Sequence, residues 1–499
     1  MRGSAARLPS PKITIDLREI SCFNRQAMFT TSKILEHTWS RLQSHYTELR
    51  PTSAWSHAYR RILGNYYRFL IPEGSSVLEI GCGSGDLLQH LPNRTLAGID
   101  LVEEQVNAAK QHLPQAQFSC AAGETATFDQ TYDYLLLSDT LNEAADVQQI
   151  LENSHHAATP ATRLVLNIHN TLWRPILGLC TLLGLKPKRP QQNWLSSDDL
   201  RNLLDLAGWE MVRSDARILV PHELCGLGSL INRFIAPLLP FACLSLFFVA
   251  RPKQAAKPAD SLSVTVIIPA RNESGNIEAA IQRTPKMGQS TEIIFVEGNS
   301  QDATWEMINS CIEKYPERDI KAYQQPGKGK GDAMRLGYAK ATGDIIMILD
   351  ADLTVPPEDL PKFFEAIQLG HCEFANGVRL VYPMEDDAMR CLNLCGNKCF
   401  SMLFSWLLSM PVKDTLCGTK VFSKSHYELI EANRSYFGNF DPFGDFDLIF
   451  GAAKLNLKIR DLPIRYQSRT YGEPQIDRWR DGMLLIRMAA FAARKIKFL

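Results

Sequence analysis

The sequence predicts an α/β protein with two doubly wound, Rossmann-like domains in one chain. Its 499 residues exceed what a single core usually serves. Two short apolar strands, Val77–Ile80 and Val264–Ile268, each run into a Gly- or Pro-containing loop and then into a predicted helix. A third apolar run, Ile345–Leu349, ends in Asp350 and Asp352. Strand, loop and helix in this order indicate parallel sheets whose strand ends carry the ligand sites.

The composition is that of a folded protein with no net charge. Apolar residues make up 45% of the chain and charged residues 22%. Lys+Arg and Asp+Glu both number 54, so no net field draws the chain to nucleic acid, and we expect no nucleic-acid partner. The 12 cysteines form no CxxC pair, which predicts reduced thiols in a cytoplasmic protein. No signal peptide is expected at the N-terminus.

A polar stretch rich in Pro and Ala, Arg251–Ser261, is typical of a semi-rigid linker. We therefore expect an N-terminal extension, a first domain, a linker, and a second domain that ends in an amphipathic helix. Their bounds are 1–50, 51–254, 255–263 and 264–499.

Two apolar segments raise the question of a membrane. Phe234–Ala250 is shorter than the roughly 20 residues that a spanning helix needs, and Pro237 and Pro240 interrupt it. Its end, Cys243–Ala250, is better interpreted as a strand. The C-terminal Met483–Leu499 is apolar with interspersed basic residues, which fits an interfacial helix and a docked terminal helix equally. We expect a cytoplasmic protein with peripheral contact at the inner face of the membrane through this helix.

In the first half, a helix is expected over Trp55–Leu70, followed by a strand and a Gly-rich turn. Gly81, Gly83 and Gly85 would let a ligand approach the backbone, and a helix over Leu87–Leu91 would offer free N–H groups. The next strand ends at Asp100, where an acid can hold ribose hydroxyls.

This part of the chain resembles the class I S-adenosylmethionine-dependent methyltransferases. The resemblance spans about residues 55–252 and implies that fold, with S-adenosyl-L-methionine as cosubstrate. The cofactor-binding residues that it implies are Glu79, Gly81, Gly83, Gly85, Asp100 and, in the adenine-side loop, Glu124.

The methyl-acceptor side is less defined. Ser138–Asn142 departs from the D-P-P-Y type sequence of amino-group DNA methyltransferases, which weakens a nucleic-acid target. Asp139 can act as a base, or as the cap of a helix from Glu143 onwards. His169 can orient an acceptor hydroxyl, or serve as a hydrogen-bonded structural group.

In the second half, three predicted strands end in acidic or polar loops. These ends hold Glu273, Glu297, and the pair Asp350 and Asp352. The pair is suited to a divalent cation shared with substrate phosphates, because Mg²⁺ takes one or two protein carboxylates and its other ligands from phosphate and water. The alternative is an acidic loop that caps the helix beginning near Pro356.

The run Ile268–Glu273 and the D-x-D triplet resemble the family-2 glycosyltransferases, whose fold is the GT-A type. The resemblance implies a nucleotide-sugar donor and Mg²⁺ or Mn²⁺ at Asp350 and Asp352. The sequence departs from the family where Glu297-Gly298 replaces a common Asp-Asp pair. The donor-side residues implied are Pro269, Ala270, Glu273, Glu297 and Asp350.

A loop rich in Gly and Lys, Pro326–Ala333, precedes a predicted helix. Lys330 and the glycines can line a diphosphate, and a mobile basic loop is the alternative.

Downstream, the sequence resembles the dolichyl-phosphate mannose synthase type. Arg379 matches an Arg that meets a phosphate, Lys420 lies in the acceptor-side stretch, and Arg469 matches a diphosphate contact. The resemblance implies a polyprenyl-phosphate or glycan acceptor. Leu394–Lys398 departs from the pattern of the family, where a further basic residue is expected.

Two acids before a predicted helix, Asp445 and Asp447, can remove the proton of an acceptor hydroxyl, and we name them with Arg469 as catalytic candidates. Their spacing also fits a helix cap with a first-turn acid, and a phosphate acceptor needs no base.

The sequence thus predicts a bifunctional enzyme that combines metal-dependent glycosyl transfer with methylation of a small or lipid-linked acceptor, within one glycolipid or cell-surface glycan pathway. Two alternatives remain open. The first is a glycosyltransferase with an S-adenosylmethionine-binding regulatory module, and the second is a non-catalytic scaffold at a membrane surface.

Overall fold

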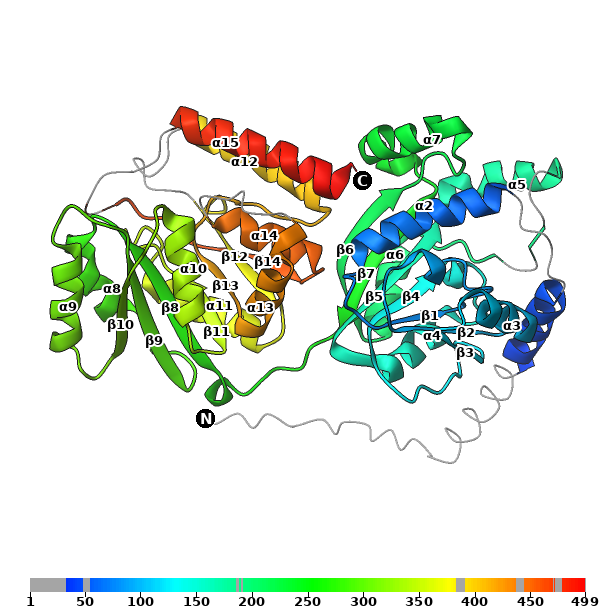
Figure 1. Ribbon diagram of the computed structural model, residues 1–499, viewed down its shortest axis with the longest axis horizontal. Coiled ribbons are helices and arrows are strands. Elements are labelled where there is room, and N and C mark those ends of the chain that lie inside the picture. Colours follow the sequence, from blue (N-terminus) through cyan, green and yellow to red (C-terminus); the bar gives the residue numbers. More distant parts are fainter. Residues whose placement is uncertain are drawn as a thin grey trace, which may run out of the picture.

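The strands of the chain form two seven-stranded sheets, one from each half (Figure 1). The computed structural model describes residues 33–47, 54–184, 188–189, 192–382, 391–436, 444–469, 471 and 478–498. The prediction of two doubly wound α/β units is confirmed.

The first sheet has the strand order β3-β2-β1-β4-β5-β7-β6. All its pairs are parallel except those of β7, which runs antiparallel to β5 and β6. The winding reverses between β1 and β4, and ligands bind beyond the carboxyl ends of strands at such a point. The strands are β1 Val77–Ile80, β2 Leu96–Asp100, β3 Gln117–Cys120, β4 Tyr132–Ser138, β5 Ala158–His169, β6 Trp209–Arg217 and β7 Ser245–Pro252.

The second sheet has the order β10-β9-β8-β11-β13-β12-β14, and β13 alone is antiparallel to its neighbours. Its winding reverses between β8 and β11, so the loops after these two strands lie at the expected ligand crevice. The strands are β8 Ser263–Ala270, β9 Ser290–Glu297, β10 Asp319–Gln324, β11 Ile345–Ile348, β12 Phe374–Val378, β13 Lys420–Ser423 and β14 Ile459–Pro463.

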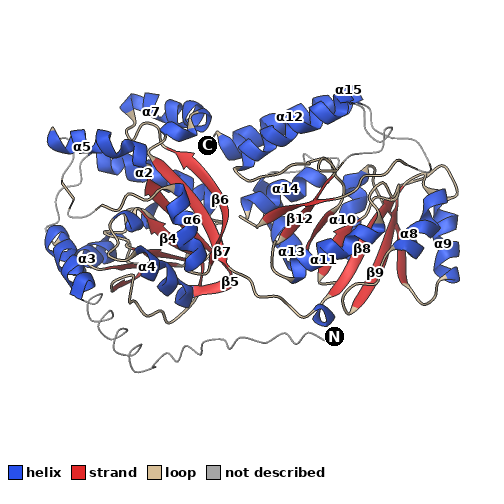
Figure 2. Ribbon diagram, turned by 180° about the vertical axis from the view of Figure 1, so that it is seen from behind, coloured by secondary structure: helices blue, strands red, loops and turns tan. Residues whose placement is uncertain are grey.

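Helices flank both sheets (Figure 2). A helix over residues 33–46 precedes those with assigned bounds. In the first half these are α2 Ala54–Leu70, α3 Glu103–His112, α4 Val147–Asn153, α5 Arg174–Leu182, α6 Ser197–Leu206 and α7 Leu227–Leu230. In the second half they are α8 Ile277–Arg283, α9 Thr304–Lys314, α10 Lys330–Lys340, α11 Leu360–Gln368, α12 Cys391–Leu408, α13 Lys424–Ala432, α14 Asp445–Lys454 and α15 Arg478–Ala492.

Both faces of the central strand β11 are buried. Ile346 and Ile348 belong to one core cluster, and Ile345 and Met347 belong to another. This division follows from the alternation of side chains along a strand. The uninterrupted apolar run before Asp350 is therefore the signature of a strand covered on two sides.

One predicted helix is wrong. The segment Leu87–Leu91 forms only a 3₁₀ turn, η1 Leu88–His90. Pro92 follows directly, and proline cannot continue a helix. The Gly-rich turn therefore does not lead into a helix whose N-terminus could bind a ligand.

The apolar run 234–250 divides between short helical turns and a strand. Two turns, η7 Ala236–Leu238 and η8 Pro240–Ala242, each contain one of the prolines, and β7 supplies the predicted strand. Within the described part of the chain, no helix combines the length and apolar character that a membrane crossing requires.

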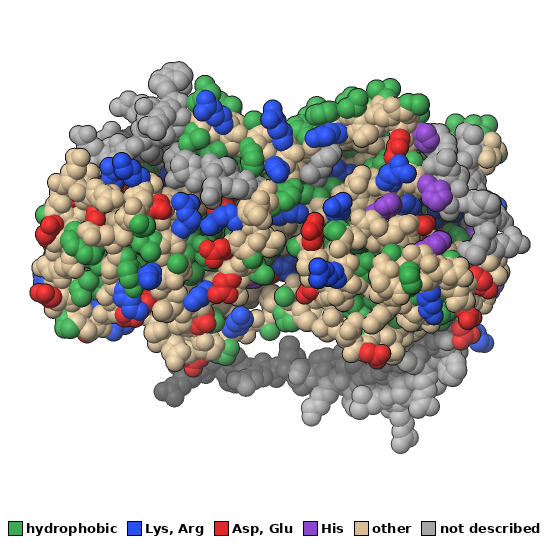
Figure 3. Space-filling model, viewed as in Figure 1, with side chains coloured by type: hydrophobic (Ala, Val, Ile, Leu, Met, Phe, Trp, Pro, Cys, Tyr) green, Lys and Arg blue, Asp and Glu red, His purple; other side chains and the backbone are tan. Residues whose placement is uncertain are grey.

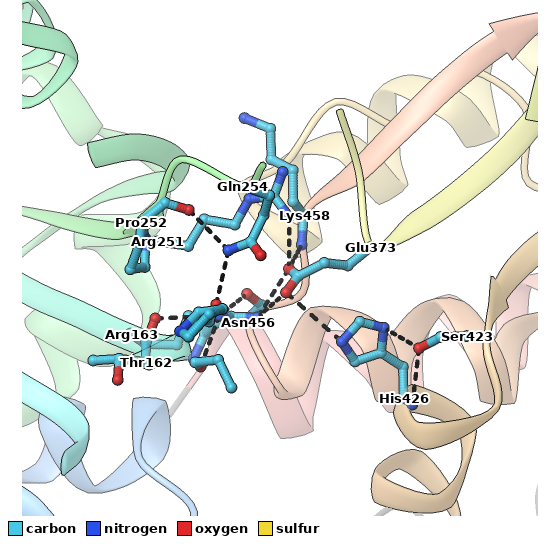
Figure 4. A network of polar contacts seen from close by, with 12 residues as sticks. Thr162, Arg163, Arg251, Pro252, Gln254, Glu373, Ser423, His426, Asn456 and Lys458 are labelled. Atoms are coloured by element: carbon cyan, nitrogen blue, oxygen red, sulfur yellow. Dashed lines mark hydrogen bonds and ion pairs between the residues drawn. The ribbon is translucent and has the colours of Figure 1, made fainter. Parts of the chain in front are cut away.

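A network of buried charges joins the two halves of the chain (Figure 4). The Nη2 of Arg163, on β5, donates to both carboxylate oxygens of Glu373, at 2.7 and 2.8 Å. Arg251, at the end of β7, lies 3.5 Å from the same carboxylate and pairs with Glu210 at 2.7 Å. Burial opposes ionisation of Glu373, but Arg163, His426 and Arg251 hold its pKa below the usual value. Removal of one partner of such a buried pair would leave an uncompensated charge without solvent.

The C-terminal segment is docked and crosses between the halves. After α15, a π-helical turn, η13 Ala493–Lys497, brings Lys497 against β6. Its Nζ lies 3.0 Å from the Asp215 carboxylate, and Arg217 donates to its carbonyl at 2.6 Å. One face of α15 is buried, whereas Met483 and Ile486 on the other face are 54% and 55% exposed.

Candidate active sites

The loop after β1 forms an open backbone cradle. Gly81 has φ +79°, a conformation that favours glycine, and Gly83 has φ +53° with open space where a side chain would stand. The N–H of Gly83 donates to Asp100 Oδ2 at 2.8 Å, and the N–H of Val102 donates to Oδ1 at 3.0 Å. The acid at the end of β2 thus braces the Gly-rich turn and lies beside its open side.

Glu79 is buried beneath this turn with one carboxylate oxygen, Oε2, that has no hydrogen-bond partner among the described residues. Burial raises the pKa of Glu79 to about 8, although Arg60 opposes the shift. A buried acceptor without a partner is costly. A cationic or hydrogen-bond-donating ligand at the turn would satisfy it, so the residues present fit a sulfonium nucleoside such as S-adenosylmethionine.

Glu124 lies in the predicted adenine-side loop but is engaged by the protein. Its Oε1 accepts hydrogen bonds from the N–H groups of Ala145 and Asp146, at 3.0 and 3.4 Å. Glu124, in the loop between β3 and β4, thus holds the segment that leads into α4.

A polar cluster surrounds Asp139 after β4. Asn167 donates to Asp139 Oδ1 at 2.6 Å, the Tyr59 hydroxyl donates to it at 3.2 Å, and His169 Nε2 lies 3.5 Å away. The capping interpretation is wrong, because α4 begins at Val147 and its capping side chain is Asp146. Asp139 itself has φ +59° and makes no cap hydrogen bond. Its carboxylate instead faces donors from two separate elements, Tyr59 on α2 and Asn167 and His169 on β5.

In the second sheet, Arg469 bridges two predicted strand ends. Its Nη2 donates to Asp352 Oδ2 at 2.6 Å, and its Nη1 donates to Glu273 Oε1 at 3.1 Å. Asn276 donates to the other oxygen of Glu273 at 2.7 Å. Burial raises the pKa of Glu273, against the opposing effects of Asn276 and Arg469. The loops after β8 and β11 and the segment before Tyr471 thus meet at one point.

Lys330 lies on the other side of the acid pair. Its Nζ, at the start of α10, is 2.6 Å from Asp350 Oδ1. Burial disfavours the ionised carboxylate, but Lys330 holds the pKa of Asp350 below its usual value, with help from Lys420 and Arg379. Both groups of this pair are therefore charged at neutral pH.

The acid pair can hold a divalent cation only with outside ligands. Among the described residues, no group of three or more His, Cys, Asp or Glu side chains could hold a metal ion. Asp350 and Asp352 supply hard oxygen donors, and Mg²⁺ characteristically takes the rest of its coordination from phosphate and water. The donor set therefore fits a cation that arrives with a diphosphate.

Gly418 allows the stretch Asp414–Lys420 to approach Asp350. A side chain built at this position would collide with the Asp350 carboxylate. Lys420 is fully buried below this stretch, donates to the carbonyl of Cys417, and has its Nζ 3.5 Å from Asp445. The Lys420 side chain thus links the backbone of the Asp414–Lys420 stretch to Asp445.

Asp445 and Asp447 are first-turn acids of α14, and they point to different neighbours. Asp445 faces Lys420, whereas Asp447 Oδ2 accepts a 2.8 Å hydrogen bond from Arg434. Residues two apart lie on opposite sides of a helix. Gly444, not an acidic residue, occupies the cap position of α14.

Four of the remaining predicted residues, Arg379, Glu297, Pro269 and Ala270, contact other parts of the protein. Arg379 makes a two-point contact with Asp414, at 2.7 and 2.9 Å. Glu297 Oε1 accepts from the N–H of Ser300 at 2.6 Å, and Pro269 and Ala270 pair in register with the end of β9. Lys398 is exposed on α12.

Comparison with known proteins assigns the two halves. The family model described as "Methyltransferase domain" matches residues 54–214, and the one described as "Glycosyl transferase family 2" matches residues 265–416. The chain joins a methyltransferase domain to a family 2 glycosyltransferase domain.

Relatives of known identity match the glycosyltransferase domain. The dolichol-phosphate mannosyltransferase of Pyrococcus furiosus is 38% identical over 122 residues, 24% of this chain and 34% of that protein. An undecaprenyl-phosphate 4-deoxy-4-formamido-L-arabinose transferase of Pectobacterium atrosepticum is 32% identical over 116 residues, 22% of this chain and 36% of that protein. The chain therefore spans about a third of the length of these relatives.

A solved structure matches the methyltransferase domain. It is an S-adenosylmethionine-dependent methyltransferase from Thermotoga maritima, with 17% identity and a TM-score of 0.30, covering 40% of this chain and 99% of that one.

The structure brings five of the charged residues predicted for the glycosyltransferase domain into two contacting groups. Glu273, Asp352 and Arg469 are in contact, as are Lys330 and Asp350. Sequence reasoning did not identify Asp414 as the partner of Arg379, or Tyr59 and Asn167 as partners of Asp139. These residues lie 28 or more positions from their partners, and nothing local in the sequence marks the pairing.

Proposed function

We propose that the protein is a bifunctional enzyme. The glycosyltransferase domain would transfer a sugar from a nucleotide-sugar to a polyprenyl-phosphate or glycan acceptor with Mg²⁺ or Mn²⁺, and the methyltransferase domain (residues 51–254) would methylate a small or lipid-linked acceptor. The observation that carries the proposal is the meeting of Asp350, Asp352, Lys330 and Arg469 at one strand end.

On the donor side, positive charges would stabilise the leaving diphosphate. A divalent cation at Asp350 and Asp352 would neutralise negative charge on the leaving diphosphate. Lys330 and Arg469 are already held against these carboxylates, and their N–H groups would donate to diphosphate oxygens. Glu273 would keep Arg469 in position, because its carboxylate accepts from the second guanidinium nitrogen.

The acceptor is inferred from chemistry and from the names of the relatives, which include dolichol-phosphate and undecaprenyl-phosphate transferases. A phosphate oxygen is already an anion and needs no base to attack the sugar carbon. Asp445, held by Lys420, would then orient the acceptor stretch. For a hydroxyl acceptor, Asp445 is the better-placed base of the two, because its contact with Lys420, at 3.5 Å, is longer than the 2.8 Å contact of Asp447 with Arg434.

The methyltransferase site would bind S-adenosylmethionine across the Gly81–Gly85 turn, with Asp100 holding the ribose and Glu79 beneath the turn. S-adenosylmethionine supplies an activated methyl group, and transfer then depends on the alignment of the nucleophile. Asp139 would accept a proton from the nucleophile while His169 stays within 3.5 Å of its carboxylate.

Sugar transfer is tested with the full chain, a panel of nucleotide-sugars and a polyprenyl phosphate. Asp350→Asn should abolish transfer, and Glu306→Gln, an exposed acid on α9, should leave it unchanged. Transfer by Asp350→Asn at the rate of the wild type, or transfer in the presence of a chelator, would reject the metal site.

S-adenosylmethionine binding is tested by calorimetry on wild type and Asp100→Ala, with the exposed Asp129→Ala as the matched control. We expect binding to be lost in Asp100→Ala alone. Binding without methyl transfer to any lipid extract would favour the regulatory module. The scaffold would be favoured if neither sugar nor methyl transfer occurs and if the affinity for nucleotide-sugar is the same in wild type and Asp352→Ala.

A further inference from the structure

The upper side of the molecule in Figure 1 carries α5, α7, α12 and α15 from both domains. Most of the large hydrophobic side chains that the described residues expose come from this side. They lie in residues 172–183, 224–241, 402–403 and 483–486, which we call the apolar edge. Monomeric soluble proteins rarely expose so many large apolar side chains together.

The apolar face of α5 points outward. Ile176 and Leu179 of α5, with Leu172 just before it and Leu183 just after it, recur at helical spacing, and the side chains of residues 172, 176, 179 and 183 are 61%, 48%, 56% and 63% exposed. No residue of α5 is buried. An amphipathic helix normally turns such a face to the core. Here the face is available to something outside the chain.

The apolar edge is continuous across the two domains. At the start of α5, Trp173 donates to the carbonyl of Ala242 in η8 at 2.9 Å. On the other domain, Trp406 of α12 donates to the carbonyl of Pro237 in η7 at 3.0 Å. Beside this second contact, Phe234, just before η7, and Phe498, just after η13, have ring centroids 5.7 Å apart. One external surface could therefore touch both domains.

The charge of the apolar edge has a single sign. The apolar edge and its flanks, residues 171–184, 224–241, 391–408 and 482–498, contain no Asp or Glu, in a chain with as many acids as bases, and Asp481 directly precedes the last stretch. Exposed cations lie in the same stretches: Arg174, Arg233, Lys398, Arg487, Arg494 and Lys495. Figure 3 shows Lys and Arg side chains among hydrophobic ones along this upper side. Glu223, at the border of the second stretch, is paired with Arg61 at 3.0 Å.

We propose that the apolar edge docks on an anionic lipid bilayer, and that α5 and residues 224–241 give the methyltransferase domain its own lipid-binding surface. Apolar side chains flanked by Lys and Arg bind at the boundary between headgroups and acyl chains. The short turns around Pro237 and Pro240 suit a segment that lies on the bilayer rather than one that crosses it. A symmetric dimer through this edge would bring cations against cations, because the stretches that carry the edge contain no Asp or Glu.

The test is co-sedimentation of the full chain with vesicles of phosphatidylcholine, with and without phosphatidylglycerol. We expect binding that requires phosphatidylglycerol and weakens at high salt. The double variant Leu179→Asp with Leu183→Asp should lower the partition coefficient roughly tenfold or more, because it removes apolar contact and adds charge repulsion. The matched controls are Leu206→Asp and Leu429→Asp, two leucines outside the apolar edge that are 59% and 51% exposed.

Three results would overturn the proposal. The first is no binding of the wild type to either vesicle. The second is equal binding by the double variant, or loss of binding only when Met483 and Ile486 are replaced by Asp. The third is a dimer, seen by sedimentation without lipid, that the double variant abolishes. No sugar or methyl donor is present, so the outcome does not depend on either transfer activity, and unchanged Tm values exclude misfolding.

Discussion

Replacing Glu373 by Gln should destabilise the protein strongly, although Glu373 is not in either candidate active site. Glu373 pairs with Arg163 at 2.7 Å and lies 3.5 Å from Arg251, and the three side chains are 8%, 4% and 0% exposed (Figure 4). Arg251 retains Glu210, but no other ion pair is found for Arg163 among the described residues. The variant therefore leaves a buried guanidinium without a counter-charge.

The loss should be about 3 kcal/mol, since removing one partner of a buried ion pair typically costs 3–5 kcal/mol. The hydrogen bonds of Arg163 to the carbonyls of Asn456, Ala161 and Thr162 favour the lower end. Calorimetry should then give a Tm that is lower by about 6 °C or more. The control is Glu358→Gln, which breaks a mostly exposed pair with Arg283 and should cost less than about 1 kcal/mol. Equal, small shifts for both variants would refute the reasoning.

Further predictions concern pH and close contacts. Burial lowers the pKa of His426, so the folded state binds fewer protons than the unfolded state. The Tm of the wild type should therefore fall as the pH drops below about 6.5, and the fall should be smaller in His426→Gln. Because burial raises the pKa of Glu79 to about 8, the wild type should lose stability as pH rises towards 8, and Glu79→Gln should gain Tm relative to wild type more at pH 9 than at pH 5. Gly418→Ala should lower sugar transfer roughly 100-fold by displacing Asp350, whereas Gly396→Ala, which meets open space, should not; equal rates would contradict this.

The site residues that could be predicted are those that lie at the end of one strand or in the loop that follows it. Two segments show this: the buried run before Asp350 and the Gly-rich turn from Gly81 to Gly85. In each, an apolar strand is followed directly by residue types that are typical of ligand binding. Their local pattern is sufficient because the carboxyl ends of parallel strands meet at one edge of a sheet. Arg469 was identified by resemblance alone. Its partners Asp352 and Glu273 are 117 and 196 positions away in the sequence, so no local pattern indicates these contacts.

The parts that could not be predicted depend on packing between distant segments. Arg163, Arg251 and Glu373 each look like ordinary surface charges in the sequence, yet they are buried together where the domains meet. The 3₁₀ turn at Leu88–His90 shows the opposite case, in which a proline signal was present and was outweighed by the apolar pattern.

The exposure of the apolar face of α5 was also hidden from the sequence. Helical spacing predicts which residues share a face but not what the face contacts, and the usual expectation is the core. Only the structure distinguishes Leu179, which is 56% exposed, from a core leucine such as Leu204 on α6, which is fully buried.

The central claim is that one chain carries two transfer sites, and mass spectrometry of lipid products tests it most directly. The full chain is incubated with S-adenosylmethionine, nucleotide-sugars and a lipid extract containing polyprenyl phosphates. We expect lipids heavier by one sugar and species heavier by one methyl group, with Asp352→Asn removing the first gain and Asp100→Ala removing the second. Sugar addition that survives Asp352→Asn, or the absence of both mass gains in the wild type, would contradict it.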